Sequence, residues 1–85
     1  MNRDVFAAIG DPNRRRILGL LAASERSVGE LATELSITQP SVTQHLALLR
    51  EVGLVTFDKR GNSSIYRLVP APLGDVSDWI SGLSQ

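Results

Sequence analysis

The sequence predicts a mainly α-helical domain with one small β-hairpin, an α+β fold of five helices. Two observations lead to this fold class. In five stretches of the chain, apolar residues recur at three- and four-residue spacing, which is the period of amphipathic helices. Between the fourth and fifth stretches, residues 54–69 are instead rich in β-branched and aromatic residues on both sides of a glycine-containing turn. The 85 residues are expected to form one domain, residues 1–85.

The first two helices are predicted to be separated by a break at Gly10. Before it, a short helix is expected over residues 3–9, with the apolar residues Val5, Phe6 and Ile9. After it, Asp11 can cap free backbone amides and Pro12 tolerates the first helical position, so a second helix begins there and continues to about Ala23. The apolar stripe of the second helix consists of Ile17, Leu20 and Leu21.

The third and fourth helices are predicted to form a helix-turn-helix. Ser27 and Glu30 fit a capping box, which begins the third helix. Residues 36–38 have about the length of a tight turn between two helices. The fourth helix has Pro40 in its first turn and ends at Gly53, which can adopt the left-handed conformation. The apolar stripes are Val28, Leu31, Ala32 and Leu35 on the third helix, and Val42, Leu46 and Leu49 on the fourth.

The exposed side of the fourth helix is predicted to carry small hydroxyl and amide groups where most solvated helices carry charges. If Val42 and Leu46 face inward, a rotation of about 100° per residue fixes the opposite side. That side consists of Pro40, Gln44, Ala47 and Glu51, flanked by Ser41 and Thr43. Hydroxyl and amide groups can donate and accept hydrogen bonds at base edges, so this surface is suited to reading a DNA groove. His45 lies nearer the core, where a packed side chain bonded to backbone or phosphate is the simpler interpretation.

The hairpin is expected to consist of strands 54–58 and 64–69 joined by a turn at residues 59–63. Two strands alone are marginally stable, so they must lie against the helices. Lys59 and Arg60 beside Gly61 are well placed to reach a phosphate or a minor groove. A merely solvated loop is the alternative.

The last helix is predicted to begin after the break at residues 70–72 and to have a strongly apolar face. Such a face either completes the domain's own core or packs against a second subunit. Together with the first helix it could form a self-complementary surface. The expected dimer interface consists of Val5, Phe6, Ile9, Val76, Trp79, Ile80 and Leu83.

Composition and charge limit the classes of function that the chain can have. The chain has no cysteine, which excludes disulfides, thiolate metal sites and a cysteine nucleophile. No stretch approaches the roughly 20 apolar residues that a membrane span needs, so we expect a cytoplasmic protein with no membrane contact. The net charge is zero, but residues 36–69 balance to +2 and the tail from Pro70 to −2, which suits a binding module of modest electrostatic reach. The single histidine has no paired carboxylate and nucleophile, which argues against an enzyme.

The order of elements is that of a winged helix-turn-helix domain, in which the hairpin is the wing. Residues 8–18, 41–46 and 51–55, followed by Gly61 and residues 65–68, resemble the ArsR/SmtB family of bacterial transcriptional repressors. The resemblance implies a homodimer, built on the first and last helices, that binds operator DNA with two recognition helices. The positions that match the family's DNA contacts are Gln39, Ser41, Thr43 and Gln44, with His45 adjoining them and Lys59 and Arg60 on the wing.

The resemblance does not extend to a metal site. In metal-sensing members, cysteines lie on the third helix, or acidic residues and histidines lie on the last. Here residues 30–35 contain no cysteine, and the tail offers Asp75 and Asp78 without a histidine. We therefore expect neither a metal nor another cofactor. An unidentified effector or partner protein stays open, with the dimer interface as its expected place.

The principal hypothesis is a homodimeric repressor that binds an inverted-repeat operator in double-stranded DNA, with autoregulation as one form of its action. The alternative is a winged-helix protein-interaction module without specific DNA binding. Zero net charge favours the alternative slightly. The clustering of Ser41, Thr43 and Gln44 on one exposed face favours DNA.

Overall fold

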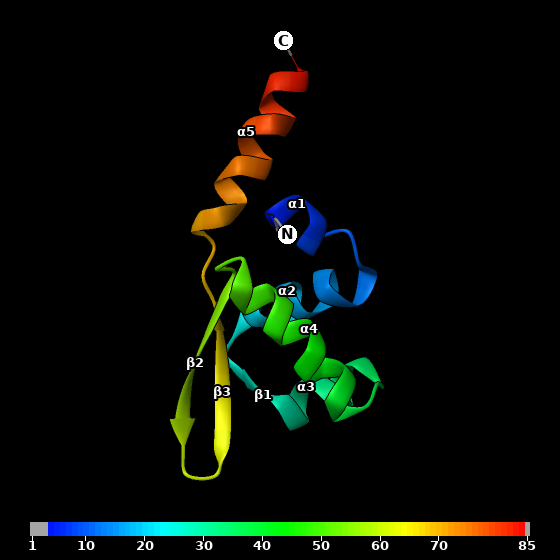
Figure 1. The fold of residues 1–85 in the computed structure, drawn as a ribbon, viewed down its shortest axis with the longest axis vertical. Coiled ribbons are helices and arrows are strands. Elements are labelled where there is room, and N and C mark those ends of the chain that lie inside the picture. Colours follow the sequence, from blue (N-terminus) through cyan, green and yellow to red (C-terminus); the bar gives the residue numbers. More distant parts are fainter. Residues whose placement is uncertain (1–3, 85) are drawn as a thin grey trace.

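A computed structural model describes residues 4–84 and shows, within them, five α-helices, a 3-10 helix and a three-stranded sheet (Figure 1). The elements in chain order are α1 (Val5–Ala8), α2 (Pro12–Ala23), β1 (Arg26–Ser27), α3 (Val28–Leu35), α4 (Gln39–Glu51), β2 (Val55–Arg60), β3 (Ser63–Leu68), η1 (Ala71–Leu73) and α5 (Gly74–Leu83). The predicted fold, five helices plus a wing, is confirmed. Arg3, the expected start of the first helix, lies outside the described residues.

The N-termini of α2 and α3 are capped as the sequence predicts. The side chain of Asp11 accepts a hydrogen bond from the backbone N–H of Arg14 at 3.0 Å, which begins α2. At the start of α3, the Glu30 amide donates to the Ser27 hydroxyl at 3.1 Å and the Ser27 amide donates to the Glu30 carboxylate at 2.8 Å. These bonds with Ser27 favour the charged carboxylate and lower the pKa of Glu30. The capping box is confirmed.

Two left-handed residues set the turns on either side of α4. Gly53 has φ +81°, as its predicted place after the helix requires. Ser36, between α3 and α4, also has a positive φ of 57°, which is uncommon for a residue with a Cβ. No residue pattern predicted this conformation at Ser36. Together the two turns hold α4 against α3 at one end and lead it into β2 at the other.

The wing differs from its prediction in two ways. Lys59 and Arg60 were expected in the turn, but they belong to β2, where they pair with Ser64 and Ser63. That expectation was wrong because Gly61, at φ +61°, allows a two-residue turn, so the strands extend further. The short strand β1 was not predicted; it pairs antiparallel with β3 and gives the strand order β1-β3-β2.

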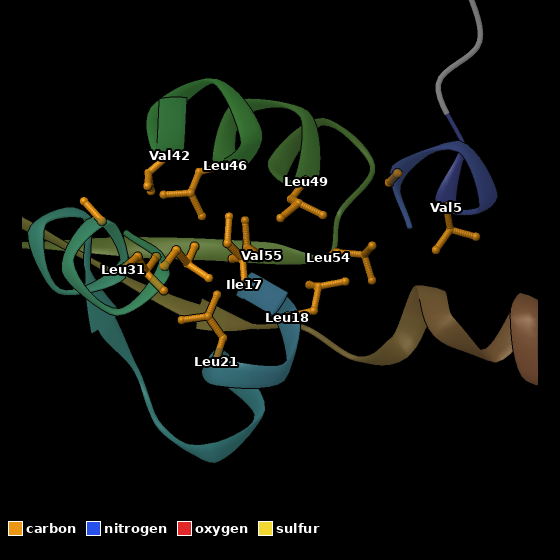
Figure 2. Packing of buried hydrophobic residues seen from close by; sticks show 13 residues of the cluster. Val5, Ile17, Leu18, Leu21, Leu31, Val42, Leu46, Leu49, Leu54 and Val55 are labelled. Carbon is orange, nitrogen blue, oxygen red and sulfur yellow. The ribbon is translucent and has the colours of Figure 1, made fainter. Parts of the chain in front are cut away.

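The core lies where α2, α3 and α4 meet the base of the sheet (Figure 2). The predicted stripe of α4 is fully buried and packs among residues from the other two helices. The largest fully buried side chains are Ile17, Leu31, Val42, Leu46, Leu49 and Leu54. The predicted stripes are confirmed except that Leu20 and Val28 are only half-buried at the edge of the core.

The last helix contributes little to this core. It projects from the body of the molecule beside α1, and the chain is elongated along that direction, with extents of 48 × 29 × 22 Å (Figure 1). No residue of α5 is buried. Of its residues, Val76 packs against the core while being only half-buried.

Replacing Leu46 with alanine is expected to destabilise the domain by about 2–5 kcal/mol, because it removes a fully buried side chain and leaves a cavity under α4. Denaturant unfolding followed by circular dichroism measures the change. Thr33→Ala is the control, since Thr33 is exposed on α3 and lies outside the expected dimer interface. Equal losses for the two variants would contradict this description of the core.

Candidate nucleic-acid interface

Burial of one side of α4 turns an uncharged polar side outward. Of the expected DNA-contacting residues on this helix, Gln39, Thr43 and Gln44 are exposed and Ser41 is half-buried. Pro40, Ala47 and Glu51 are exposed beside them, as the helical rotation predicts. The N-terminal half of α4 thus presents hydroxyl and amide groups to the surroundings.

This surface continues across a polar groove to the wing. A depression of about 400 Å³ separates the start of α4 from the turn between β2 and β3. It is lined by Ser27, Val28, Gly29, Gln39, Thr43, Asn62, Ser63 and Ser64. None of these residues carries a charge. Sequence reasoning missed Ser27 and residues 62–64 because it considered the wing for its basic residues; the run of small polar residues at the turn was the signal.

Two arginines lie along the other half of α4. Arg14 and Arg50 line a shallow hollow of about 720 Å³ together with Gln44 and His45. The guanidinium of Arg50 lies 4.6 Å from the centre of the Phe57 ring, a cation–π contact that ties the end of α4 to β2. Neither arginine was among the expected DNA contacts. They add positive charge to a hollow that is also lined by the acidic residue Glu51.

His45 is a partly packed residue, as its simpler interpretation predicts. Its side chain is 17% exposed, and Nη1 of Arg14 lies 3.4 Å from its Nδ1. Because arginine can only donate, this contact is a hydrogen bond only in the tautomer in which Nδ1 accepts. Arg14 also donates to the carbonyl oxygens of Ala8 at 2.6 Å and Ala7 at 3.3 Å, so one side chain joins the end of α1 to α4.

Asp11 completes the surroundings of His45. One carboxylate oxygen of Asp11 lies 3.9 Å from Nδ1 of His45, too far for a hydrogen bond. The pKa of Asp11 is lowered, first by the hydrogen bond from the Arg14 backbone and to a smaller degree by the charges of His45 and Arg14. Asp11 is therefore a carboxylate at neutral pH, at the edge of the hollow.

The two basic residues of the wing differ in their surroundings. Lys59 is exposed and makes no ion pair within residues 4–84. Because neighbouring residues of a strand face opposite sides, Lys59 shares a face with Phe57, towards α4, whereas Arg60 lies on the other face. There the guanidinium of Arg60 is bound by the carboxylate of Glu25, with Nη1–Oε1 2.5 Å and Nη2–Oε2 3.3 Å.

Ion pairs with acidic residues engage two arginines of the wing. Glu25 raises the pKa of Arg60 through a hydrogen bond and its charge. On the same face, Arg67 forms an ion pair with Asp58. In the unbound protein Glu25 therefore engages the charge of Arg60, and the expectation that Arg60 contacts DNA stays a prediction. Lys59 is the wing cation that the described part of the chain leaves without an acidic partner.

Comparison with known proteins places this arrangement in a family. The family model described as "Bacterial regulatory protein, arsR family" matches residues 11–56, from the start of α2 into β2. The chain belongs to the arsR family. It is a DNA-binding transcriptional regulator, and α4 is the second, recognition helix of its helix-turn-helix.

Relatives of this regulator cover most of the chain. The transcriptional repressor SdpR of Bacillus subtilis is 34% identical over 77 residues, which cover 91% of this chain and 86% of SdpR. The HTH-type transcriptional repressor SmtB of Mycobacterium tuberculosis is 36% identical over 73 residues, which cover 86% of this chain and 54% of SmtB. The chain thus spans nearly the length of one relative and about half the length of the other.

Solved structures share the fold. An ArsR-like transcriptional regulator from Rhodococcus sp. RHA1 is 32% identical, with a TM-score of 0.84 over 94% of this chain and 73% of that chain. HlyU from Vibrio cholerae is 33% identical, with a TM-score of 0.77 over 93% of this chain and 83% of that chain. The arrangement of helices and wing described above is therefore the arrangement of this family.

Among the described residues, no group of three or more histidine, cysteine, aspartate or glutamate side chains could hold a metal ion. No helix in residues 4–84 is long and apolar enough to cross a membrane.

We predict that Gln44→Ala and Lys59→Ala affect DNA binding in different ways. Loss of an amide that bonds a base edge should cost about 1–3 kcal/mol and relax the preference at one base pair. Loss of a cation that meets phosphate should weaken binding to all sequences and reduce the salt dependence. Fluorescence anisotropy with matched and single-substituted duplexes at several salt concentrations measures both. If the two variants behaved alike, the separation of reading and phosphate-binding groups would be wrong.

Proposed function

We propose that the chain is a homodimeric repressor that binds an inverted-repeat operator and blocks transcription. The observation that carries this proposal is the uncharged polar surface of α4, continued by the groove that ends at Asn62. Groups of this kind discriminate between bases because each must find its own donor or acceptor. A surface built for electrostatic attraction alone would be richer in lysine and arginine.

Individual roles follow from side-chain chemistry. Gln44 can bond the N6 and N7 edge of an adenine with both ends of its amide. Thr43 offers a methyl group to thymine and a hydroxyl to a base acceptor. Ser41, which is half-buried, is better suited to a phosphate. In the tautomer in which Nδ1 accepts, His45 can donate through Nε2 to a phosphate next to the Arg14 guanidinium.

A second copy of the chain is the proposed occupant of the apolar surface on α1 and α5. Phe6 is 41% exposed and packs edge-on against Trp79, with ring centres 5.8 Å apart. Trp79 is 56%, Ile80 54% and Leu83 66% exposed, so α5 lacks a partner along most of its length. Ile9 and Val76 are half-buried beside them. Val5, by contrast, is buried within the protomer's own core.

Dimerisation supplies DNA contacts that one protomer lacks. Two copies related by a two-fold axis double the few phosphate contacts and read two half-sites at once, about 10 to 10.5 base pairs apart. This geometry favours an inverted-repeat operator. The names of SdpR and SmtB as repressors support repression as the outcome, with the chain's own promoter among the candidate targets.

Selection of bound duplexes from fragmented genomic DNA by the purified protein tests the proposal. We expect enrichment of sites that share an inverted repeat, followed by binding to a selected duplex at least about a thousandfold tighter than to random DNA at physiological salt. Equal affinity for both would overturn specific recognition. Such a result, with the α5 surface capturing a protein, would favour the interaction module, for which zero net charge is the supporting observation.

Placing a charge on the exposed face of α5 should separate the protomers. Ile80→Asp is expected to shift sedimentation equilibrium from dimer to monomer and to weaken operator binding by at least tenfold, because a carboxylate is costly to bury at an apolar contact. Ser81→Asp, about 100° further around the same helix, is the matched control and should leave the dimer intact. A wild-type monomer, or a dimer unaffected by Ile80→Asp, would overturn the proposed interface.

A further inference from the structure

The ion pair between Glu25 and Arg60 joins two segments that are far apart in the sequence. Glu25 lies between α2 and β1, and Arg60 is the last residue of β2 before the wing turn. The two nitrogens of the guanidinium meet the two oxygens of the carboxylate, at 2.5 and 3.3 Å. This is the fork-to-fork arrangement in which arginine also binds a phosphate. Glu25 thus presents to Arg60 the same geometry as a DNA backbone would.

The pair is exposed enough to exchange. The side chains of Arg60 and Glu25 are 53% and 39% exposed, and ion pairs at such positions contribute little to folding stability. Asp58 adds a second carboxylate oxygen at 3.9 Å from Arg60, while its closer partner is Arg67. The guanidinium is thus held by carboxylates whose side chains are themselves partly exposed. An incoming phosphate can replace Glu25 without unfolding the wing.

We propose that Glu25 occupies Arg60 in place of a DNA phosphate and thereby limits the affinity of the wing for DNA of any sequence. The inference rests on the proposed DNA binding and adds a residue that opposes it. Neutralising a phosphate releases counterions, so an arginine engaged by a carboxylate contributes less to sequence-independent attraction. Base reading by α4 then forms a larger share of the binding energy. Glu25 is in this sense a specificity-determining residue that touches no base.

Glu25→Gln tests the proposal, because glutamine has a similar shape but no charge to hold the guanidinium. Anisotropy titrations with a random-sequence duplex and with a selected operator duplex are run from low to physiological salt. The variant is expected to bind random DNA about three- to tenfold more tightly at low salt. The slope of log affinity against log salt should steepen by about 0.9, the value for one more phosphate contact.

Variants at Asp75 and Arg60 isolate the cause of the expected tighter binding. Asp75→Asn removes one negative charge from the start of α5 and frees no arginine. It should leave the affinity for DNA unchanged, which would show that the change in net charge does not cause the tighter binding. Arg60→Ala should abolish the gain, so that the double variant with Glu25→Gln binds like Arg60→Ala alone. Glu25→Ala, checked by thermal unfolding, repeats the test with a different side chain.

The outcomes separate this inference from the proposed function. Tighter binding that depends on Arg60 supports it. If wild-type protein binds operator but Glu25→Gln and Glu25→Ala bind equally well or more weakly, the pair is a brace for the wing and the inference is overturned. If neither wild type nor any variant binds either duplex, the proposed function fails with it.

Discussion

Burial of Val42, Leu46 and Leu49 is the constraint on which the rest of the structure depends. These three side chains are fully enclosed between α2, α3 and the base of the sheet, so α4 has one permitted rotation about its axis. That rotation turns the polar N-terminal half of the helix outward. The groove leading to the wing, the packing of His45 against Arg14 and the stacking of Arg50 on Phe57 all follow from it. A helix free to turn would present no fixed pattern of donors and acceptors.

The second constraint is charge. Positive and negative side chains balance over the whole chain, and the wing pairs two of its arginines with Glu25 and Asp58. A protomer of this kind attracts DNA weakly, since phosphate neutralisation supplies most sequence-independent affinity. The proposed dimer compensates by doubling the contacts, which gives the exposed Trp79 face a role in DNA binding as well as in assembly. Weak attraction to DNA of any sequence, together with two copies of the base-reading α4 surface, favours discrimination between sequences.

Local patterns predicted most of the fold and the exposed face of α4. The capping box at Ser27 and the break at Gly53 depend on neighbouring residues, and the exposed face of α4 follows from helical period alone. Other features depend on segments distant in sequence. Strand β1 has only two residues and exists through its pairing with β3, while Arg60 meets Glu25 across 35 positions. Neither contact produces a periodic pattern of residues in the sequence. The polar groove likewise forms only when the wing turn reaches the start of α4.

An NMR titration of ¹⁵N-labelled protein with a selected operator duplex tests whether the rotation of α4 creates the surface that reads DNA. The side-chain amides of Gln39, Gln44 and Asn62 report from the helix and from the far side of the groove. We expect these three amide signals to shift most and signals from α5 beyond the dimer contact to change little. Unchanged side-chain amides, with the largest shifts on α2 or α5, would contradict it.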